Sequence, residues 1–250
     1  EASKFPSGDD PFTLLNIRGF SRGFSVAAVA RNLLFPWRFL TAYWQSRQLL
    51  THFSPDVVVG TGGYASGLPL LAAVHKKIPT LIHEQNSFPG FTTRWLADRV
   101  ERLCLSYEES AAYLKKKSFH LTGNPVRKDL NAMSKREALN HFNMDHGKPV
   151  IAVIGGSQGS KTLNETVTAA VEQMKMNDIQ ILWQTGTVHY ERLKHLETDS
   201  PMVKVFPFTD DMGAVYSAAD LIVSRAGALA LAEIAYCGKP SLLIPFPGAA

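Results

Sequence analysis

The sequence predicts an α/β protein made of two doubly wound domains, each built around a parallel sheet. Short apolar runs that read as buried strands alternate with helical segments along the 250 residues of the chain. The alternation falls into two sets, and each set has a glycine-rich turn directly after a strand, at 60–63 and at 155–159. Because the composition becomes polar after Arg127, we place the domains at residues 1–127 and 128–250.

In the first domain we expect short strands separated by helices. Pro36 lies inside the longest predicted helix and indicates a break there. The strands are expected at 12–17, 57–59, 79–83, 102–106 and 119–121, and the helices at 26–52, 68–76, 91–100 and 108–116.

The second domain begins with a polar stretch, 128–148, that predicts a linker followed by a surface helix. It ends in a strand–turn–helix–strand unit, in which Gly227 belongs to the turn, and Gly238 with Pro240 ends the helix. The strands are expected at 149–154, 179–183, 203–206, 220–224 and 241–247, with helices at 163–174 and 228–236.

The composition is typical of a soluble globular protein, with 45% hydrophobic residues and a net charge of +4. Cys104 and Cys237 are far apart and lie in apolar segments, so we expect reduced thiols and neither a disulfide framework nor a zinc site. The sequence shows no run of 18 apolar residues and no signal peptide, so we expect no membrane-spanning segment.

Residues 11–55 form a basic and aromatic segment. It contains five arginines and no Asp or Glu, and three large aromatic residues fall within 35–39. Such a surface suits anionic lipid headgroups, would also accept nucleic acid, or could be a core-facing helix with a solvated basic face. We favour a membrane surface over nucleic acid, because three aromatic rings and a proline are hard to bury on one helix.

The turn at 155–162, GGSQGSKT, nearly matches a phosphate-binding loop. Ser160 stands where that pattern needs a glycine, and no later strand ends in the acid that would hold magnesium, so we do not expect a nucleotide hydrolase. The turn could still offer backbone N–H groups and the Ser157 hydroxyl to a diphosphate without metal. It could equally be a tight packing turn.

Three further places could contact a ligand. In His83-Glu84-Gln85-Asn86, at a strand tip, Glu84 could act as a base or hold a sugar hydroxyl, and Asn86 could donate a hydrogen bond. Arg127 could reach a diphosphate or pair with a carboxylate. Glu233 could accept hydrogen bonds from the hydroxyls of a ribose while the start of its helix attracts phosphate. An ordinary surface glutamate is an equally good interpretation.

Taken together, these turns resemble the MurG family, the bacterial UDP-N-acetylglucosamine:undecaprenyl-diphospho-muramoyl-pentapeptide N-acetylglucosaminyltransferases. The resemblance covers essentially all 250 residues, and it rests on several motifs in one order. The motifs are GTGGYASG at 60–67, HEQN at 83–86, GNPVR at 123–127, GGSQG at 155–159, DDM at 210–212, RAGAL at 225–229 with Glu233, and PFP at 245–247.

The resemblance implies a GT-B fold, in which two Rossmann-like domains face a cleft, and an inverting transfer that needs neither metal nor cofactor. GlcNAc would pass from UDP-GlcNAc to the muramoyl C4 hydroxyl of lipid I, giving lipid II for peptidoglycan synthesis. The protein would work as a peripheral protein on the cytoplasmic face of the bacterial plasma membrane. The implied partners are UDP-GlcNAc, lipid I and an anionic membrane surface, with no nucleic acid.

The motifs also imply roles for single residues. Ser157 and Arg127 would lie beside the diphosphate, the backbone of Thr209 would meet the uracil, and Glu233 would take the ribose hydroxyls. Asn86 would reach the donor sugar from the amino-terminal domain. Two further positions, Ala228 and Leu229, would line the phosphate and sugar pocket. The family's membrane-docking patch corresponds to Phe24, Arg31, Phe35, Trp37, Arg38, Trp44 and Trp95.

The chain departs from the family pattern in several places. It lacks the family's opening strand and the loop with a His proposed to assist the acceptor hydroxyl, which leaves Glu84 as the remaining candidate base. Ala226 and Ala230 stand where many members have Ser and Thr. We therefore expect the first strand of the amino-terminal domain to be absent, residues 1–250 alone to be inactive, and the natural protein to be longer.

Two other functions stay open at this point. One is a related GT-B glycosyltransferase that places a sugar on diacylglycerol. The other is a UDP-sugar-binding protein that has lost catalysis.

Overall fold

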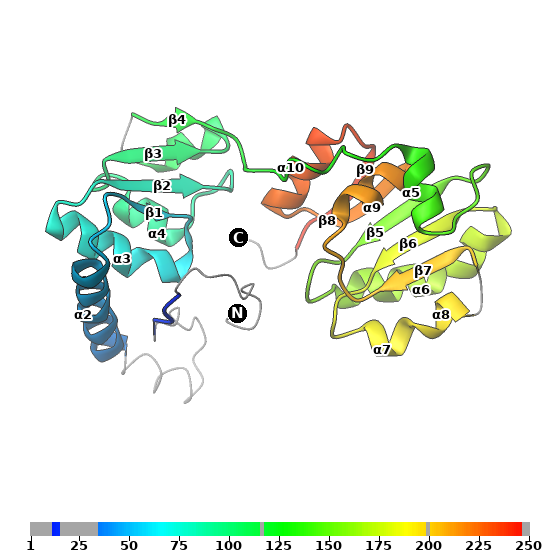
Figure 1. Ribbon diagram of the computed structural model, residues 1–250, viewed down its shortest axis with the longest axis horizontal. Helices are drawn as coiled ribbons and strands as arrows, with labels where there is room; N and C mark the ends of the chain where they lie inside the picture. Colours follow the sequence, from blue (N-terminus) through cyan, green and yellow to red (C-terminus); the bar gives the residue numbers. More distant parts are fainter. Residues whose placement is uncertain (1–11, 16–34, 116–117, 199–200, 247–250) are drawn as a thin grey trace. The chain divides into compact units, whose positions relative to one another are not determined.

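The computed structural model describes residues 12–15, 35–115, 118–198 and 201–246, which Figure 1 draws as ribbons. Packing divides the chain into two compact units, Glu1–Gly123 and Asn124–Ala250. Each unit has its own parallel sheet with helices packed around it, so the α/β class predicted from the sequence is confirmed.

Four parallel strands form the sheet of the first unit. They are β1 (Val58–Gly60), β2 (Thr80–Glu84), β3 (Arg102–Leu105) and β4 (His120–Leu121). The described strands lie in chain order, without a reversal. Glu84 pairs with Leu105 in the register, so the carboxyl ends of β2 and β3 lie side by side.

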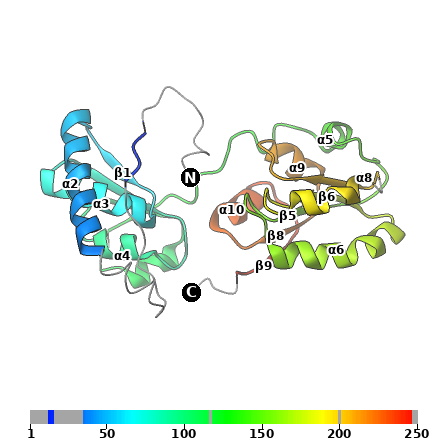
Figure 2. The same cartoon turned by 90° about the horizontal axis from the view of Figure 1, so that it is seen from below.

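The described helices of the first unit are α2 (Phe35–Phe53), α3 (Gly63–Lys76), α4 (Phe91–Leu96) and the 3-10 helix η2 (Glu108–Tyr113). Pro36 lies in the first turn of α2, where a missing N–H leaves no helical hydrogen bond unmade. Helix α3 packs against both α2 and β1, as Figures 1 and 2 show. Its leucines, Leu68, Leu70 and Leu71, belong to the same buried cluster as Ile82 and Leu103 of the sheet.

Two predictions for this unit are wrong over the residues that the structure describes. Residues 12–15 form no strand, and Phe12 and Leu14 are exposed. A strand needs a hydrogen-bonded neighbour, and the four described strands pair only with one another. The helix expected at 108–116 is the shorter η2, whose backbone bonds join residues three apart, as in Ser110 N–H to Tyr107 O.

The sheet of the second unit has five parallel strands and is doubly wound. They are β5 (Val150–Ile154), β6 (Gln180–Gln184), β7 (Val203–Phe206), β8 (Leu221–Arg225) and β9 (Ser241–Ile244). Their order is β7-β6-β5-β8-β9, so the chain first builds outward from β5 on one side and then returns to its other side. This reversal defines a switch point between β5 and β8, the place where open α/β sheets bind ligands.

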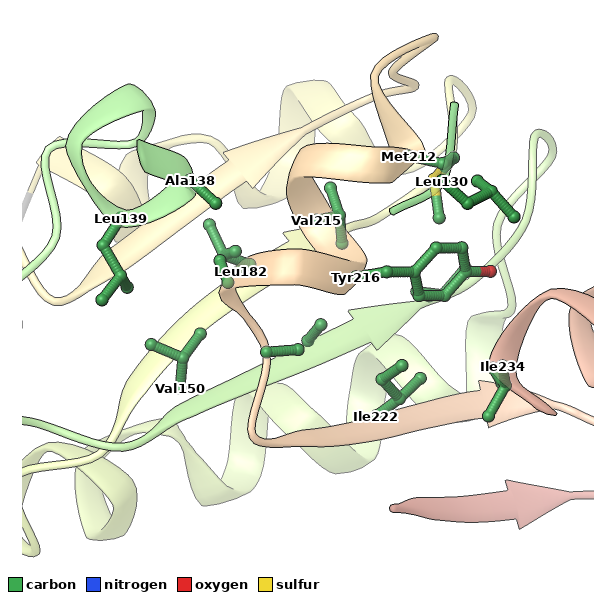
Figure 3. Packing of buried hydrophobic residues seen from close by; sticks show 14 of the residues in the cluster. Leu130, Ala138, Leu139, Val150, Leu182, Met212, Val215, Tyr216, Ile222 and Ile234 are labelled. Atoms are coloured by element: carbon green, nitrogen blue, oxygen red, sulfur yellow. The ribbon is translucent and has the colours of Figure 1, made fainter. Parts of the chain in front are cut away.

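Helices cover both faces of this sheet. They are α5 (Lys135–His141), α6 (Lys161–Met176), α7 (Tyr190–Leu193), α8 (His195–Thr198), α9 (Met212–Ala218) and α10 (Ala228–Tyr236). Residues of α5, α9 and α10 share one buried cluster with the strands, which Figure 3 shows from close by. Residues of α6, α7 and α8 share a second cluster, and Figure 2 shows α6 and α9 on opposite sides of the sheet.

The polar stretch after Arg127 contains the predicted surface helix, α5. Its start is set by a capping box: the Ser134 hydroxyl accepts from the Glu137 N–H, and the Glu137 carboxylate accepts from the Ser134 N–H at 2.9 Å. Ala138 and Leu139 bury the inner face of α5 against α9. This helix therefore belongs to the second unit and helps to fix α9, which borders the candidate site.

Candidate functional site

The carboxyl ends of β5 and β8 each lead into one of the turns that the sequence analysis singled out. Gly155, Gly156 and Ser157 follow β5, while Ala226 and Gly227 follow β8 and lead into α10. Ile154 and Ser224, near the two strand ends, pair directly in the sheet. The sheet thus brings together, at the switch point, two turns that are about 70 residues apart in the sequence.

Part of the glycine turn after β5 is a packing turn. Gly159 has a φ of +80°, and a Cβ built there would lie 2.1 Å from the Thr185 backbone oxygen. Gly186 has a φ of +81°, and a Cβ there would lie 2.0 Å from the Gly159 nitrogen. The turns after β5 and β6 therefore touch backbone to backbone, which only glycine allows.

The start of the same turn, at Gly156, is not packed against another segment. Gly156 has a φ of +79°, and a Cβ built there would meet nothing within 4 Å. The Ser157 carbonyl accepts a hydrogen bond from the Thr187 N–H at 3.3 Å, which anchors this part of the turn. Helix α6 is capped by its own Ser160, whose hydroxyl accepts from the Leu163 N–H at 3.4 Å. An anion at the start of α6 would compete with this cap.

The start of α10 is open by comparison. Gly227 precedes the helix in an extended conformation and provides no side-chain cap. The first intrahelical bond runs from the Leu231 N–H to the Gly227 carbonyl at 2.9 Å. The N–H groups before Leu231 therefore have no acceptor within the helix, and they point out of its N-terminal end. Leu229 is exposed and Ala228 is half-buried. Helix α10 thus offers backbone donors and the positive end of its dipole to an anion.

Glu233 lies one and a half turns further along α10 and is held by a buried tyrosine. The Tyr216 hydroxyl on α9 donates to Glu233 Oε2 at 2.9 Å. Figure 3 shows Tyr216 lying between α9 and the sheet, where it is almost fully buried. Burial, followed by the charge of Glu233, raises the pKa of Tyr216 well above its usual range. Tyr216 is therefore a fixed donor that orients the carboxylate and leaves Oε1 for another partner.

Arg127 and Thr209, two further predicted site residues of the second unit, both contact the loop that leads into α9. Arg127 Nη1 donates to the Asp210 carbonyl oxygen at 2.6 Å, and the positive charge of Arg127 acts on Tyr216. The Thr209 hydroxyl accepts from the Asp211 N–H at 3.1 Å, and Asp211 in turn caps α9 through the Ala214 N–H at 3.0 Å. Arg127 and the cap of α9 thus hold the loop before α9, and the exposed Arg127 guanidinium is a cation that acts on Tyr216, the partner of Glu233.

The strand-tip motif of the first unit is organised around Glu84. Its side chain is buried, with 2% exposure, and accepts hydrogen bonds from Asn86, Gly90 and Thr93. His83 Nε2 lies 2.9 Å from the Gly123 carbonyl oxygen, and His83 Nδ1 lies 3.1 Å from Gln85 Nε2. These contacts favour a structural role for Glu84 over the role of base suggested by the sequence.

The predicted docking residues fall partly on the described surface. Trp37 and Trp44 on α2 are 70% and 60% exposed, while Phe35 and Arg38 are half-buried. Half-buried Trp95 contacts two phenylalanines, with ring centroids 6.3 Å from both Phe39 and Phe91. Phe24 and Arg31 lie outside the described residues.

Sequence reasoning missed Tyr216, Thr93 and Gly186. Tyr216 stands in an alanine-rich segment, and only the packing of α9 against α10 brings it to Glu233. Thr93 lies nine residues from Glu84, on α4, and Gly186 lies in a different turn from Gly159. Each of the three acts through a tertiary contact and carries no local motif.

The described residues contain neither a membrane-spanning helix nor a metal-binding cluster. No helix among them is long and apolar enough to cross a bilayer. Within the same ranges, no group of three or more His, Cys, Asp and Glu side chains is arranged to hold a metal ion.

Family models match both halves of the chain. The glycosyltransferase family 28 N-terminal domain matches residues 7–104, and the glycosyltransferase family 28 C-terminal domain matches residues 150–250. The fold and the matched domains therefore define a family 28 glycosyltransferase as the class of this protein.

Relatives narrow this class to one family. The chain is 40% identical over 240 residues to a UDP-N-acetylglucosamine–N-acetylmuramyl-(pentapeptide) pyrophosphoryl-undecaprenol N-acetylglucosamine transferase of Listeria welshimeri, covering 95% of this chain and 65% of the relative. It is 36% identical over 252 residues to the transferase of the same name from Flavobacterium psychrophilum, covering 100% of this chain and 67% of the relative. The chain belongs to the family of these transferases, the MurG family, which confirms the resemblance seen in the sequence.

Solved structures agree with this assignment. The crystal structure of Acinetobacter baumannii MurG matches with a TM-score of 0.64 and 31% identity, covering 86% of this chain and 60% of that one. The glycotransferase of kitacinnamycin matches with a TM-score of 0.63 at 16% identity, which shows the fold alone. The chain spans about two thirds of the length of the curated relatives it matches.

Proposed function

We propose that the natural protein transfers GlcNAc from UDP-GlcNAc to the muramoyl C4 hydroxyl of lipid I, forming lipid II. Membership of the MurG family supports this proposal. The observation that carries it is the uncapped start of α10 at the switch point, with a tyrosine-held Glu233 on the same helix. This arrangement offers donors for a diphosphate and an acceptor for ribose hydroxyls, the two recognition features of a nucleoside diphosphate sugar.

In the proposed complex, the second unit binds the nucleotide. The first N–H groups of α10, at Ala228 and Leu229, and the turn at Ser157 bind the diphosphate, and the Arg127 guanidinium adds positive charge. Glu233 accepts from the ribose hydroxyls. The described geometry supports this because α10 is open at its start and Arg127 already lies beside the loop before α9.

The remaining donor contacts complete the proposed complex. The backbone at Thr209 meets the uracil, and Asn86 of the first unit contacts the donor sugar. We propose an inverting reaction without metal. The acceptor oxygen forms a bond to the anomeric carbon as the bond to the diphosphate breaks, the hydroxyl proton passes to a base, and UDP leaves with the bonding electrons.

We further propose that the protein docks on the anionic cytoplasmic face of the plasma membrane through α2. Trp37, Leu40 and Trp44 are exposed and share one face of this helix, because they are spaced three and four residues apart. The Arg47 guanidinium lies 5.6 Å from the Trp44 ring, so a cation accompanies the aromatic stripe. Exposed aromatic rings with adjacent arginines suit a lipid headgroup region.

A transfer assay tests the proposed reaction. The natural protein is given UDP-GlcNAc labelled in the sugar, with lipid I or diacylglycerol as the acceptor. We expect label in the lipid II product and none in a glycolipid of diacylglycerol. Transfer to diacylglycerol would support the alternative glycosyltransferase, and binding of UDP-GlcNAc without turnover on either acceptor would show a non-catalytic protein.

A further inference from the structure

The segment 124–127 contacts two parts of the candidate site in the second unit. Asn124 Nδ2 donates to the Ala228 carbonyl oxygen, at the start of α10, at 3.4 Å. Arg127 Nη1 donates to the Asp210 carbonyl oxygen, in the loop before α9, at 2.6 Å. All four residues belong to the second unit. The proposed complex gives a role to Arg127 but none to Asn124.

The contact with Ala228 determines which end of the Asn124 amide faces α10. A backbone carbonyl oxygen can only accept, so the NH2 group of Asn124 must lie against it. Pro125 follows, and the residue before a proline is biased toward an extended backbone, which limits the directions that the Asn124 side chain can take. The half-buried Asn124 is therefore a donor in a restricted position.

The Ala228 carbonyl shares one peptide group with the Leu229 N–H. A trans peptide group is planar, so its C=O and N–H point in opposite directions. A hydrogen bond that holds the Ala228 oxygen therefore also sets the direction of the Leu229 N–H. This N–H precedes the first intrahelical bond, which begins at Leu231, so it has no acceptor within the helix. A donor to the carbonyl also polarises the peptide group, which strengthens the N–H as a donor.

This contact differs from an ordinary N-terminal cap. Ser160 orders the start of α6 by accepting from an N–H group of the first turn, that of Leu163, at 3.4 Å. Gly227 provides no such side-chain bond at the start of α10. Asn124 instead holds a carbonyl of the first turn, so the N–H groups of that turn are left for a ligand. A helix start that binds an anion needs both properties, order and free donors.

We infer that Asn124 is a positioning residue that orders the first turn of α10 for the diphosphate of the nucleotide sugar. This inference rests on the proposed function, in which the N–H groups at Ala228 and Leu229 bind the diphosphate. Glu233 lies further along the same helix and takes the ribose. Loss of the Asn124 amide should therefore weaken binding of the diphosphate and leave binding of the nucleoside nearly unchanged.

Inhibition by UDP and by uridine separates these two effects. In the natural protein, the inhibition constants of both compounds against UDP-GlcNAc are measured for Asn124→Ala and for Asn124→Leu, which keeps the branched shape without the donor. We expect inhibition by UDP to weaken about two- to tenfold in both variants, the scale of one hydrogen bond, and inhibition by uridine to change less than about twofold. Asn131→Ala, at an exposed asparagine further along the chain, is the control and should keep both values.

The two inhibitors also distinguish failure of the inference from failure of the proposed function. Glu233→Ala serves as a reference and should weaken inhibition by both, because UDP and uridine share the ribose. An unchanged preference for UDP in both Asn124 variants would overturn the positioning role. Equal losses of UDP and uridine inhibition, or loss of both in both variants, would also overturn it, because Asn124 would then hold more than one turn. In the wild type, UDP that inhibits no better than uridine would instead contradict the proposed function.

Discussion

At the level of single residues, the buried hydroxyl of Tyr216 orients the carboxylate of Glu233. Tyr216 has a raised pKa because it is buried beside the charge of Glu233, so it donates to Glu233 Oε2 at any physiological pH. The sequence points to Glu233 through its place on a helix that follows a strand. It gives no sign of Tyr216, because the contact depends on the packing of α9 beside α10.

We predict that Tyr216→Phe raises the KM for UDP-GlcNAc about two- to tenfold with little change in kcat, the scale of one hydrogen bond of about 0.5–1.5 kcal/mol. The control is Tyr236→Phe, an exposed tyrosine on α10. If Tyr216 acts through Glu233, the substitution should add little to Glu233→Ala. Fully additive effects in the double variant would show that Tyr216 acts independently.

At the scale of elements, two glycine turns set the shape of the switch point. The sequence locates the turn at 155–159 but leaves open whether it packs or binds, since the two uses call for the same residue. The structure divides the turn: Gly159 packs on the turn after β6, while the Cβ position of Gly156 is open. Glycines with the same positive φ therefore differ in what surrounds them, which no local pattern records.

This division predicts different costs for two alanine substitutions. Gly156→Ala should lower stability by about 1–2 kcal/mol, the strain of a left-handed residue with a Cβ. Gly159→Ala has the same strain and also a backbone clash, so its loss should be larger by about 1–3 kcal/mol, the range for overpacking. Thermal unfolding of both variants measures this. Equal midpoints would contradict the packing role of Gly159.

At the scale of the whole molecule, the sequence predicts the α/β class, the doubly wound second unit and the family. These three predictions are confirmed because buried parallel strands and glycine turns leave strong local signals in the sequence, as in residues 149–154 and 220–224. The strand expected at 12–17 fails over its described part because a short apolar run does not specify a pairing partner. The burial of Glu84 is likewise set by groups from a later loop and helix.

Membrane docking is a property of the whole molecule and has its own prediction. Trp37→Ser combined with Trp44→Ser should weaken binding to vesicles containing anionic phospholipid roughly tenfold, because about 1.4 kcal/mol of apolar burial is lost. Phe53→Ser is the control, since Phe53 is exposed on the opposite side of α2. Vesicle co-sedimentation measures the effect. Equal losses in the control and in the double variant would contradict docking through this face.

We propose that the switch point of the second unit binds the nucleotide sugar through Glu233. The most direct test is the KM for UDP-GlcNAc of the natural protein and of Glu233→Ala, with Glu165→Ala on exposed α6 surface as the control. We predict that KM rises about 5- to 150-fold in Glu233→Ala, as expected for about 1–3 kcal/mol of lost charged hydrogen bonding, while kcat changes little. A KM equal to that of the wild type would remove Glu233 from the site and contradict the claim.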